Sequence, residues 1–357
     1  MNKLRKIFTL DSLVVPLVAI VLGLIVGALV MLLGNYNPIE AYSALIKRVV
    51  GSPYHVGETI RQVTPLIFTG LAVAFAFRSG MFNIGADGQV LIGMTTATAV
   101  SLSLDGVHAL VSVPLAVIAG GLAGGCWAAI AGFLKAKRGI NEVITTIMLN
   151  WVALYFSNYI IRHFFLLKGQ NRSEDIQASA SMTFLSSIFD NARVHWGTVI
   201  ALIAAAFFYI YLWKTKQGYE MRAVGFNQHA AEYAGMNVGR NVIKAMFISG
   251  VFAGLAGTFE VLGVFHFQSV FAASPGYGFD GIAVALLGMN HPIGVVFAAI
   301  LYGGLTYGSA GMSFAAGVPP ELIKIIIGSI IFFIAAQGIV RFILKPFYLK
   351  RKKEKVL

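Results

Sequence analysis

The chain has very little cysteine and little charge. Of its 357 residues, one is cysteine, Cys126, and 12% are charged, about half of the roughly 25% usual in soluble domains. A single cysteine excludes an intrachain disulfide and a thiolate metal cluster. The low charge, together with 57% hydrophobic residues and a mean hydropathy of +0.78, excludes a soluble domain of this length. We therefore interpret the chain as an integral membrane protein.

Missing motifs narrow the function further. The sequence contains no G-x-x-x-x-G-K-[ST] phosphate loop and no His-Glu-x-x-His, Ser-Lys or paired catalytic Asp motif, so we expect no ATP hydrolysis and no enzyme activity in this chain. No second ligand stands at metal spacing from His266, and we expect no metal or cofactor. The net charge of +12 lies in short clusters between apolar runs, which fits a membrane protein and gives no reason to expect nucleic acid as a partner.

Apolar runs predict about ten transmembrane helices. The clear runs cover about 14–34, 110–134, 142–167, 196–213, 245–264 and 320–340, and shorter or interrupted runs cover about 62–79, 84–104, 276–290 and 292–311. The first run has spanning length and no cleavage pattern after it, so we interpret it as a helix and not as a signal peptide.

Charge placement orients these helices. Most of the 27 Lys and Arg, including a basic tail at 341–357, fall on the side that holds both termini, which predicts cytoplasmic termini. We treat 1–357 as a single transmembrane domain with approximate halves 1–170 and 190–345, separated by an outer loop.

One stretch interrupts the apolar pattern near its centre. "FRSGMFNIGADGQVLIG", from Phe77 to Gly93, places Arg78, Asn83, Asp87 and Gln89 among four glycines. Lipid cannot satisfy freed backbone groups, so we predict a helix break within 80–88 that faces the protein interior.

The segment "GYGFDGIAVALLGM" at 276–289 weakly echoes 80–94. Chance similarity in glycine-rich sequence is one explanation, but paired interrupted segments in two halves are typical of repeat-built transporters. We therefore expect two weakly related halves with interrupted helices.

A hydrophilic loop at 214–244 contains a short predicted helix. Asn227 is a good N-cap, "QHAAEYA" is a helical segment and Gly235 is a stop signal. Taken alone, the pattern favours an ordinary loop helix over a functional one.

Five blocks in this chain resemble a known family. "HAAEYAG" resembles the EAA loop of ABC importer permeases, although His229 stands where that motif has Glu and the downstream Leu-Pro is missing. "FRSGMFNIGADGQ", "NEVITTIMLNWVAL", "GFNQHAAEYAGMNV", "SGVFAGLAGTFEVLG" and "GFDGIAVALLGMNHPIG" follow in the order found in bacterial permeases of the branched-chain amino acid and simple-sugar importer family. Within that family the blocks are most similar to nucleoside-type permeases that work with a basic-membrane-protein lipoprotein.

The resemblance implies a multi-pass subunit of the bacterial cytoplasmic membrane and several partners. These are two cytoplasmic ATPases that carry the ATP and Mg, a second permease that is identical or homologous, an external substrate-binding lipoprotein and a small-molecule substrate. The loop helix would dock into the ATPase through a coupling set comprising Asn227, Ala230, Ala231, Glu232, Tyr233, Gly235 and Met236, with Tyr233 and Met236 as expected anchors.

Polar residues within the apolar runs are candidates for the substrate pathway. Thr146, Asn150, Ala153 and Ser157 share one helix face, for which helix packing is the alternative role. Three glycines, Gly250, Gly254 and Gly257, form a packing ridge that leads to Glu260, an ionisable residue that requires a cavity or a partner. The candidate pathway residues are Asn83, Asp87, Gln89, Asn150, Glu260, Gln268 and Asp280.

These observations predict the permease subunit of an ATP-dependent importer for nucleosides. Simple sugars and branched-chain amino acids are alternative substrates within the same class. In another class, an H⁺- or Na⁺-coupled secondary transporter would use Asp87, Glu260 and Asp280 as coupling carboxylates.

Overall fold

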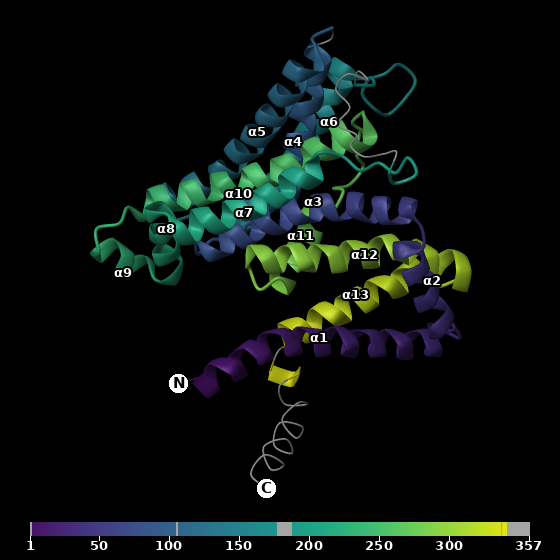
Figure 1. Ribbon diagram of the computed structural model, residues 1–357. Coiled ribbons are helices and arrows are strands. Elements are labelled where there is room, and N and C mark those ends of the chain that lie inside the picture. Colours follow the sequence, from purple (N-terminus) through teal and green to yellow (C-terminus); the bar gives the residue numbers. More distant parts are fainter. Residues whose placement is uncertain (1, 105, 177–187, 337, 341–357) are drawn as a thin grey trace. The chain divides into compact units, whose positions relative to one another are not determined.

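The computed structural model describes residues 2–104, 106–176, 188–336 and 338–340 (Figure 1). The basic tail at 341–357 and part of the predicted outer loop therefore lie outside the described residues. Within the described ranges the chain is helical, with two isolated β-bridges and no β-strand. The predicted all-α class is confirmed.

Thirteen α-helices and two π-helical turns make up the described elements. In chain order they are α1 (Asn2–Leu33), α2 (Pro38–Val50), α3 (Pro53–Arg78), α4 (Ala86–Ser103), α5 (Ala109–Arg138), α6 (Glu142–Ile160), η1 (Ile161–Phe165), α7 (Gly197–Lys214), α8 (Lys216–Phe226), α9 (Gln228–Tyr233), α10 (Val238–Glu260), η3 (Val261–Phe265), α11 (Tyr277–Leu287), α12 (Pro292–Ala316) and α13 (Pro320–Ala335). Each predicted apolar run overlaps one of these α-helices.

Among the described residues, six helices are long and apolar enough to cross a membrane. They are α3, α5, α6 with η1, α7, α10 with η3, and α12. The chain is thus a multi-pass membrane protein, while the total of ten spans and the side of the termini stay predictions.

The chain divides into two compact units. The first comprises Met1–Gly51 and Leu305–Leu357, and the second comprises Ser52–Gly304. This division does not test the predicted halves, which concern sequence repeats. In the first unit, α1 packs along α13, and the Arg48 guanidinium lies 5.0 Å from the centre of the Tyr307 ring.

Glycines bring the central helices of the second unit into backbone contact. Helix α10 packs against α5, α4 and α3. A Cβ added at Gly254 would lie 2.6 Å from the carbonyl oxygen of Gly120 on α5, so only glycine fits this crossing. The predicted ridge on 245–264 is confirmed as a packing surface.

The two π-helical turns close one end of the second unit. After η1 and η3 the chain becomes extended, and the two extended segments pair through their backbones. Ser173 N donates to Gln268 O at 2.8 Å, and Ile176 N donates to His266 O at 2.8 Å. The short helices α8 and α9 lie at the opposite end of this unit (Figure 1).

Candidate functional site

The predicted helix break lies between α3 and α4. Helix α3 ends at Arg78 and α4 begins at Ala86, and the connecting segment is buried or partly buried except at Gly80, which is exposed. Gly80 has φ +76, and a Cβ there would lie 2.7 Å from the Cα of Gly225 on α8. Both the conformation and the close approach require glycine. The prediction of a break that faces the protein interior is confirmed.

Two side-chain amides stabilise this break. Asn83 Nδ2 donates to Gln89 Oε1 at 2.9 Å, and Gln89 Nε2 donates back to Asn83 Oδ1 at 3.0 Å. Asn83 also donates to Ser249 Oγ on α10 at 2.8 Å, and this hydroxyl donates to the carbonyl oxygen of Ala72 on α3 at 2.7 Å. The amide pair therefore joins three helices and satisfies polar groups that lipid could not.

Asn150 connects α6 to the same break. Its Oδ1 accepts from Gly88 N at 2.8 Å, and its Nδ2 donates to Ile84 O at 3.0 Å. One amide thus satisfies a free N–H in the first turn of α4 and a carbonyl of the connecting segment. The other members of the predicted polar stripe on α6 are buried as well.

The charged residues on either side of the break contact the two ends of α11. At its N-terminus, Asp87 accepts from Gly278 N at 2.7 Å, from Gly276 N at 3.3 Å and from the Ser274 hydroxyl. Beyond its C-terminus, Arg78 Nε donates to Asn290 O at 2.9 Å. An anion at the helix N-terminus and a cation at the C-terminus both complement the helix dipole. The charges around the break therefore clamp α11 from both ends.

The contact at Asp87 also brings together the two segments of similar sequence, 80–94 and 276–289. The two similar segments both open a helix, α4 and α11, and these helix N-termini meet at Asp87. A Cβ at Gly278 would clash with the backbone of Asp87.

Two side chains of α11, Tyr277 and Asp280, form hydrogen bonds with neighbouring elements. Tyr277 Oη donates to Glu260 Oε2 at 3.0 Å, and Tyr302 Oη donates to Asp280 Oδ1 at 2.6 Å. Glu260 is 1% exposed, and its Oε1 has no hydrogen-bond partner among the described residues. The expectation that Glu260 faces a partner and not lipid is confirmed.

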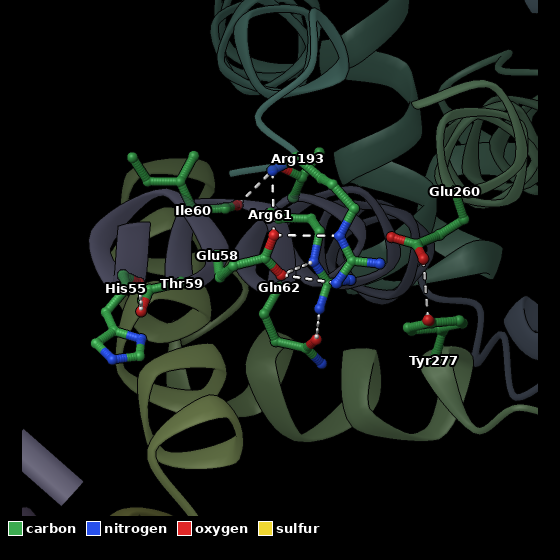
Figure 2. A network of polar contacts seen from close by, with 10 residues as sticks. His55, Glu58, Thr59, Ile60, Arg61, Gln62, Arg193, Glu260 and Tyr277 are labelled. Carbon is green, nitrogen blue, oxygen red and sulfur yellow. Dashed lines mark hydrogen bonds and ion pairs between the residues drawn. The ribbon is translucent and has the colours of Figure 1, made fainter. Parts of the chain in front are cut away.

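A second charged cluster lies near Glu260, at the N-terminal end of α3 (Figure 2). Buried Glu58 accepts from Arg61 Nε at 2.8 Å and from Arg193 Nη2 at 2.9 Å. Arg193 lies outside the helices, and its hydrogen bond with Glu58 raises the pKa of the guanidinium. Sequence reasoning missed this cluster, although a Glu-x-x-Arg spacing directly before the apolar run at 62–79 was a detectable signal.

Gln268 lies on the extended segment after η3 and contacts α4 and α6. Its Nε2 donates to Ser157 Oγ at 2.7 Å and to Thr95 Oγ1 at 3.0 Å. Its Oε1 is buried without a hydrogen-bond partner in the described part of the chain. The structure thus groups Asn83, Asp87, Gln89 and Asn150 at one break and places Gln268, Glu260 and Asp280 at separate contacts.

The predicted loop helix is α9. Asn227 Oδ1 caps it by accepting from Ala230 N at 3.0 Å, and Gly235 ends it with φ +79. Ala231 is 3% exposed and packs inward, whereas Tyr233 is 97% exposed. Met236 is half-buried and packs against the cluster that contains Ala231. The helix therefore has an anchored face and a free face.

No group of three or more His, Cys, Asp or Glu in the described residues could hold a metal ion. The side chains described above bind helix ends, amides and one another. Such a site is suited to conformational change and to weak polar contacts, and it offers no nucleophile paired with a base.

The multi-pass helical bundle contains buried helix breaks, and at one end it carries the short helix α9, one face of which is exposed. Together these features define a membrane transport subunit. Residues 56–335 match the family of permease components of branched-chain amino acid transport systems, and the chain belongs to this family.

Relatives match along nearly the whole chain. The guanosine ABC transporter permease protein NupP of Bacillus subtilis is 50% identical over 337 residues, which cover 94% of this chain and 96% of that protein. The nucleoside ABC transporter permease protein NupB of Lactococcus lactis is 41% identical, with 96% and 94% covered. The glucose ABC transporter permease protein TsgB13 of Haloferax volcanii is 32% identical, with 89% and 86% covered. No solved structure matches the chain.

Proposed function

We propose that this chain is the transmembrane permease subunit of an ABC importer for nucleosides. The observation that carries this proposal is the near full-length similarity to two permeases named for guanosine and nucleosides, at 50% and 41% identity. The glucose permease relative is less similar, at 32% identity. A sugar is therefore the alternative substrate that an experiment must exclude.

The proposal includes partners that supply energy and substrate. Two cytoplasmic ATPases bind ATP and Mg and hydrolyse the nucleotide. A second permease, identical or homologous, completes the membrane part, and an external lipoprotein delivers the nucleoside. The complex lies in the bacterial cytoplasmic membrane with both permease termini in the cytoplasm.

Helix α9 is the proposed contact with the ATPase. Its free face presents Tyr233, a large aromatic side chain that is 97% exposed in the subunit. Beside it, a shallow cavity of about 400 Å³ is lined by Glu232, Gly235 and Met236, among others. Exposed aromatic residues beside a cavity are common hot spots of protein interfaces.

The docking contact is tested best at Tyr233. An Ala231→Arg change would not isolate docking, because Ala231 is buried within the subunit. We expect Tyr233→Ala to abolish co-purification with the ATPase and uptake while the permease still reaches the membrane. Tyr219→Ala, on the exposed surface of α8, is the matched control. Retention of the ATPase by Tyr233→Ala would refute the docking assignment.

The buried polar cluster is the proposed mechanical element of transport. Because Asp87 and Arg78 hold opposite ends of α11, a movement of the α3–α4 break carries α11 with it. We infer that transport depends on the seven candidate pathway residues because they shape the polar wall that moves with the path, while tight substrate binding belongs to the lipoprotein. Glu260 and Asp280 organise the pathway through Tyr277 and Tyr302 and do not cycle protons.

The substrate is tested by uptake in a strain that lacks the chain. Radiolabelled purine and pyrimidine nucleosides, glucose and a branched-chain amino acid are offered with and without the restored gene. The proposal predicts restored uptake of at least one nucleoside and no change for the other two classes. Restored glucose uptake without nucleoside uptake would contradict it.

A further inference from the structure

Helix α6 has two chemically different faces. The face that contains Asn150 and Ser157 is buried against α4. The opposite direction carries aromatic side chains one turn apart, which we call the α6 aromatic face, comprising Trp151, Tyr155 and Tyr159 of α6 and His163 of the adjoining η1. Trp151 is 54% exposed and Tyr155 is 67% exposed in the subunit.

Two of these side chains lie at an unusual depth for their chemistry. Helix α6 has 19 residues, so it is about 28 Å long at the α-helical rise, close to the roughly 30 Å hydrocarbon core. Trp151 is its middle residue, and Tyr155 is one turn further along. Trp and Tyr normally gather at the membrane surfaces, a role that fits Tyr159 and His163 near the end of the helix and does not fit Trp151.

Lipid is a poor neighbour for the two central residues. The Trp151 Nε1–H and the Tyr155 hydroxyl have no hydrogen-bond partner among the residues that the structure describes, and hydrocarbon offers none. Their rings are stacked, with the Trp151 and Tyr155 ring centres 6.5 Å apart at an interplanar angle of 27°. At the end of the helix, the Tyr159 and His163 ring centres are 4.2 Å apart.

The interior of the subunit does not provide a comparable surface. Asn83, Gln89 and Asn150 are buried, and their hydrogen bonds go to one another and to nearby backbone and hydroxyl groups. A planar solute that enters between these groups would have to break the contacts that hold the α3–α4 break. The exposed side of α6 lies directly behind this cluster. It presents flat aromatic rings whose polar groups, the Trp151 N–H and the Tyr155 hydroxyl, are available for hydrogen bonds.

We propose that the α6 aromatic face lines the translocation path and stacks the base of the nucleoside in transit, with Trp151 and Tyr155 as the central contacts. This inference rests on the proposed nucleoside function and adds where in the subunit the base is recognised. Aromatic side chains stack any nucleobase through its π-face, and the Tyr155 hydroxyl and Trp151 N–H can bond base edges or water. The path then runs along the outside of the isolated subunit, where the second permease closes it.

The first test measures uptake by the complete complex of both permeases, ATPase and lipoprotein. Trp151→Leu and Tyr155→Leu remove a stacking ring each, and uptake at nucleoside concentrations well below saturation should fall about tenfold, the loss of binding expected for one stacked base. Trp151→Phe and Tyr155→Phe keep a ring and should retain most of the rate. Phe207→Leu, an exposed aromatic residue at the middle of α7, is the matched control and should transport normally.

The outcomes separate this inference from the proposed function. If the parent complex transports no nucleoside, the proposed function fails. If the parent transports nucleosides and both Leu variants match Phe207→Leu, the stacking inference alone is overturned.

The second test asks whether water reaches this face. The single native thiol, Cys126, is exposed, so it is first replaced by Ala. In that background, Tyr155→Cys should react with a charged, membrane-impermeant thiol reagent in the assembled complex, and a transported nucleoside should slow the reaction. Phe207→Cys should stay unreactive. Reaction of Tyr155→Cys no faster than Phe207→Cys would mean that lipid or the second permease covers this face, and would overturn the inference.

Discussion

Removing the Asn150 amide should destabilise the α3–α4 break. Asn150→Ala leaves the Gly88 N–H and the Ile84 carbonyl, now bonded at 2.8 and 3.0 Å, without partners in a buried site. An unpaired buried polar group costs about 1–3 kcal/mol, so the two together cost about 2–6 kcal/mol. At about 2 °C per kcal/mol for a large domain, the melting temperature should fall by about 4–12 °C.

The assay is thermal unfolding of the purified subunit in detergent, combined with nucleoside uptake by the complete complex. Asn150→Asp keeps an acceptor for Gly88 N–H but sets a carboxylate oxygen against the Ile84 carbonyl, so it should also lose stability. Thr145→Ala is the matched control, because the Thr145 hydroxyl bonds only the carbonyl of Asn141, the N-cap of its own helix. If Asn150→Ala lowers the melting temperature no more than Thr145→Ala, the amide does not hold the break.

Three further changes test other parts of the structure. Glu58→Gln removes the buried charge that contacts both Arg61 and Arg193. It should lower the free energy of unfolding by roughly 3–5 kcal/mol, measured by thermal unfolding, and an unchanged stability would refute a structural ion pair. Gly254→Ala should prevent close packing on Gly120 and cost about 1–3 kcal/mol or abolish assembly, whereas normal unfolding would contradict the backbone contact. Burial lowers the pKa of His195 to about 4 from 6.5, so the unfolded chain binds a proton at this histidine at a higher pH than the folded chain does. The free energy of unfolding should therefore decline by up to roughly 3 kcal/mol as pH falls from 6.5 to 4. His195→Asn should flatten this decline, and a variant with the same pH dependence as the parent would refute the assignment.

Much of the helical organisation follows from physical rules that act locally. The break after Arg78 was predictable because glycines interrupt the helix there, and lipid cannot satisfy the freed backbone groups or the polar side chains. Helix α9 was predictable because an N-cap and a left-handed glycine mark its ends. The buried face of α6 followed from helical periodicity alone.

Contacts between distant segments could not be predicted in the same way. Nothing local indicates that Asp87 caps α11 or that Arg78 binds beyond its other end, because these pairs are separated by about 200 residues in sequence and depend on the packing of α3, α4 and α11. The pairing of the segments after η1 and η3 also lacked a signal, since neither segment has strand periodicity. The exposure of Trp151 became informative only when the opposite face of α6 was seen to be buried.

The coupling of transport to ATP tests the central claim most directly. The complete complex is reconstituted in vesicles, and radiolabelled nucleoside uptake is measured with ATP held constant, with and without a protonophore, for the parent chain and for the Glu260→Gln and Asp280→Asn variants. An ABC importer permease predicts that parent uptake requires ATP and is unchanged by the protonophore, and that neither variant makes uptake depend on the proton gradient. Collapse of parent uptake with the gradient, while ATP is constant, would contradict the account and favour a proton-coupled transporter.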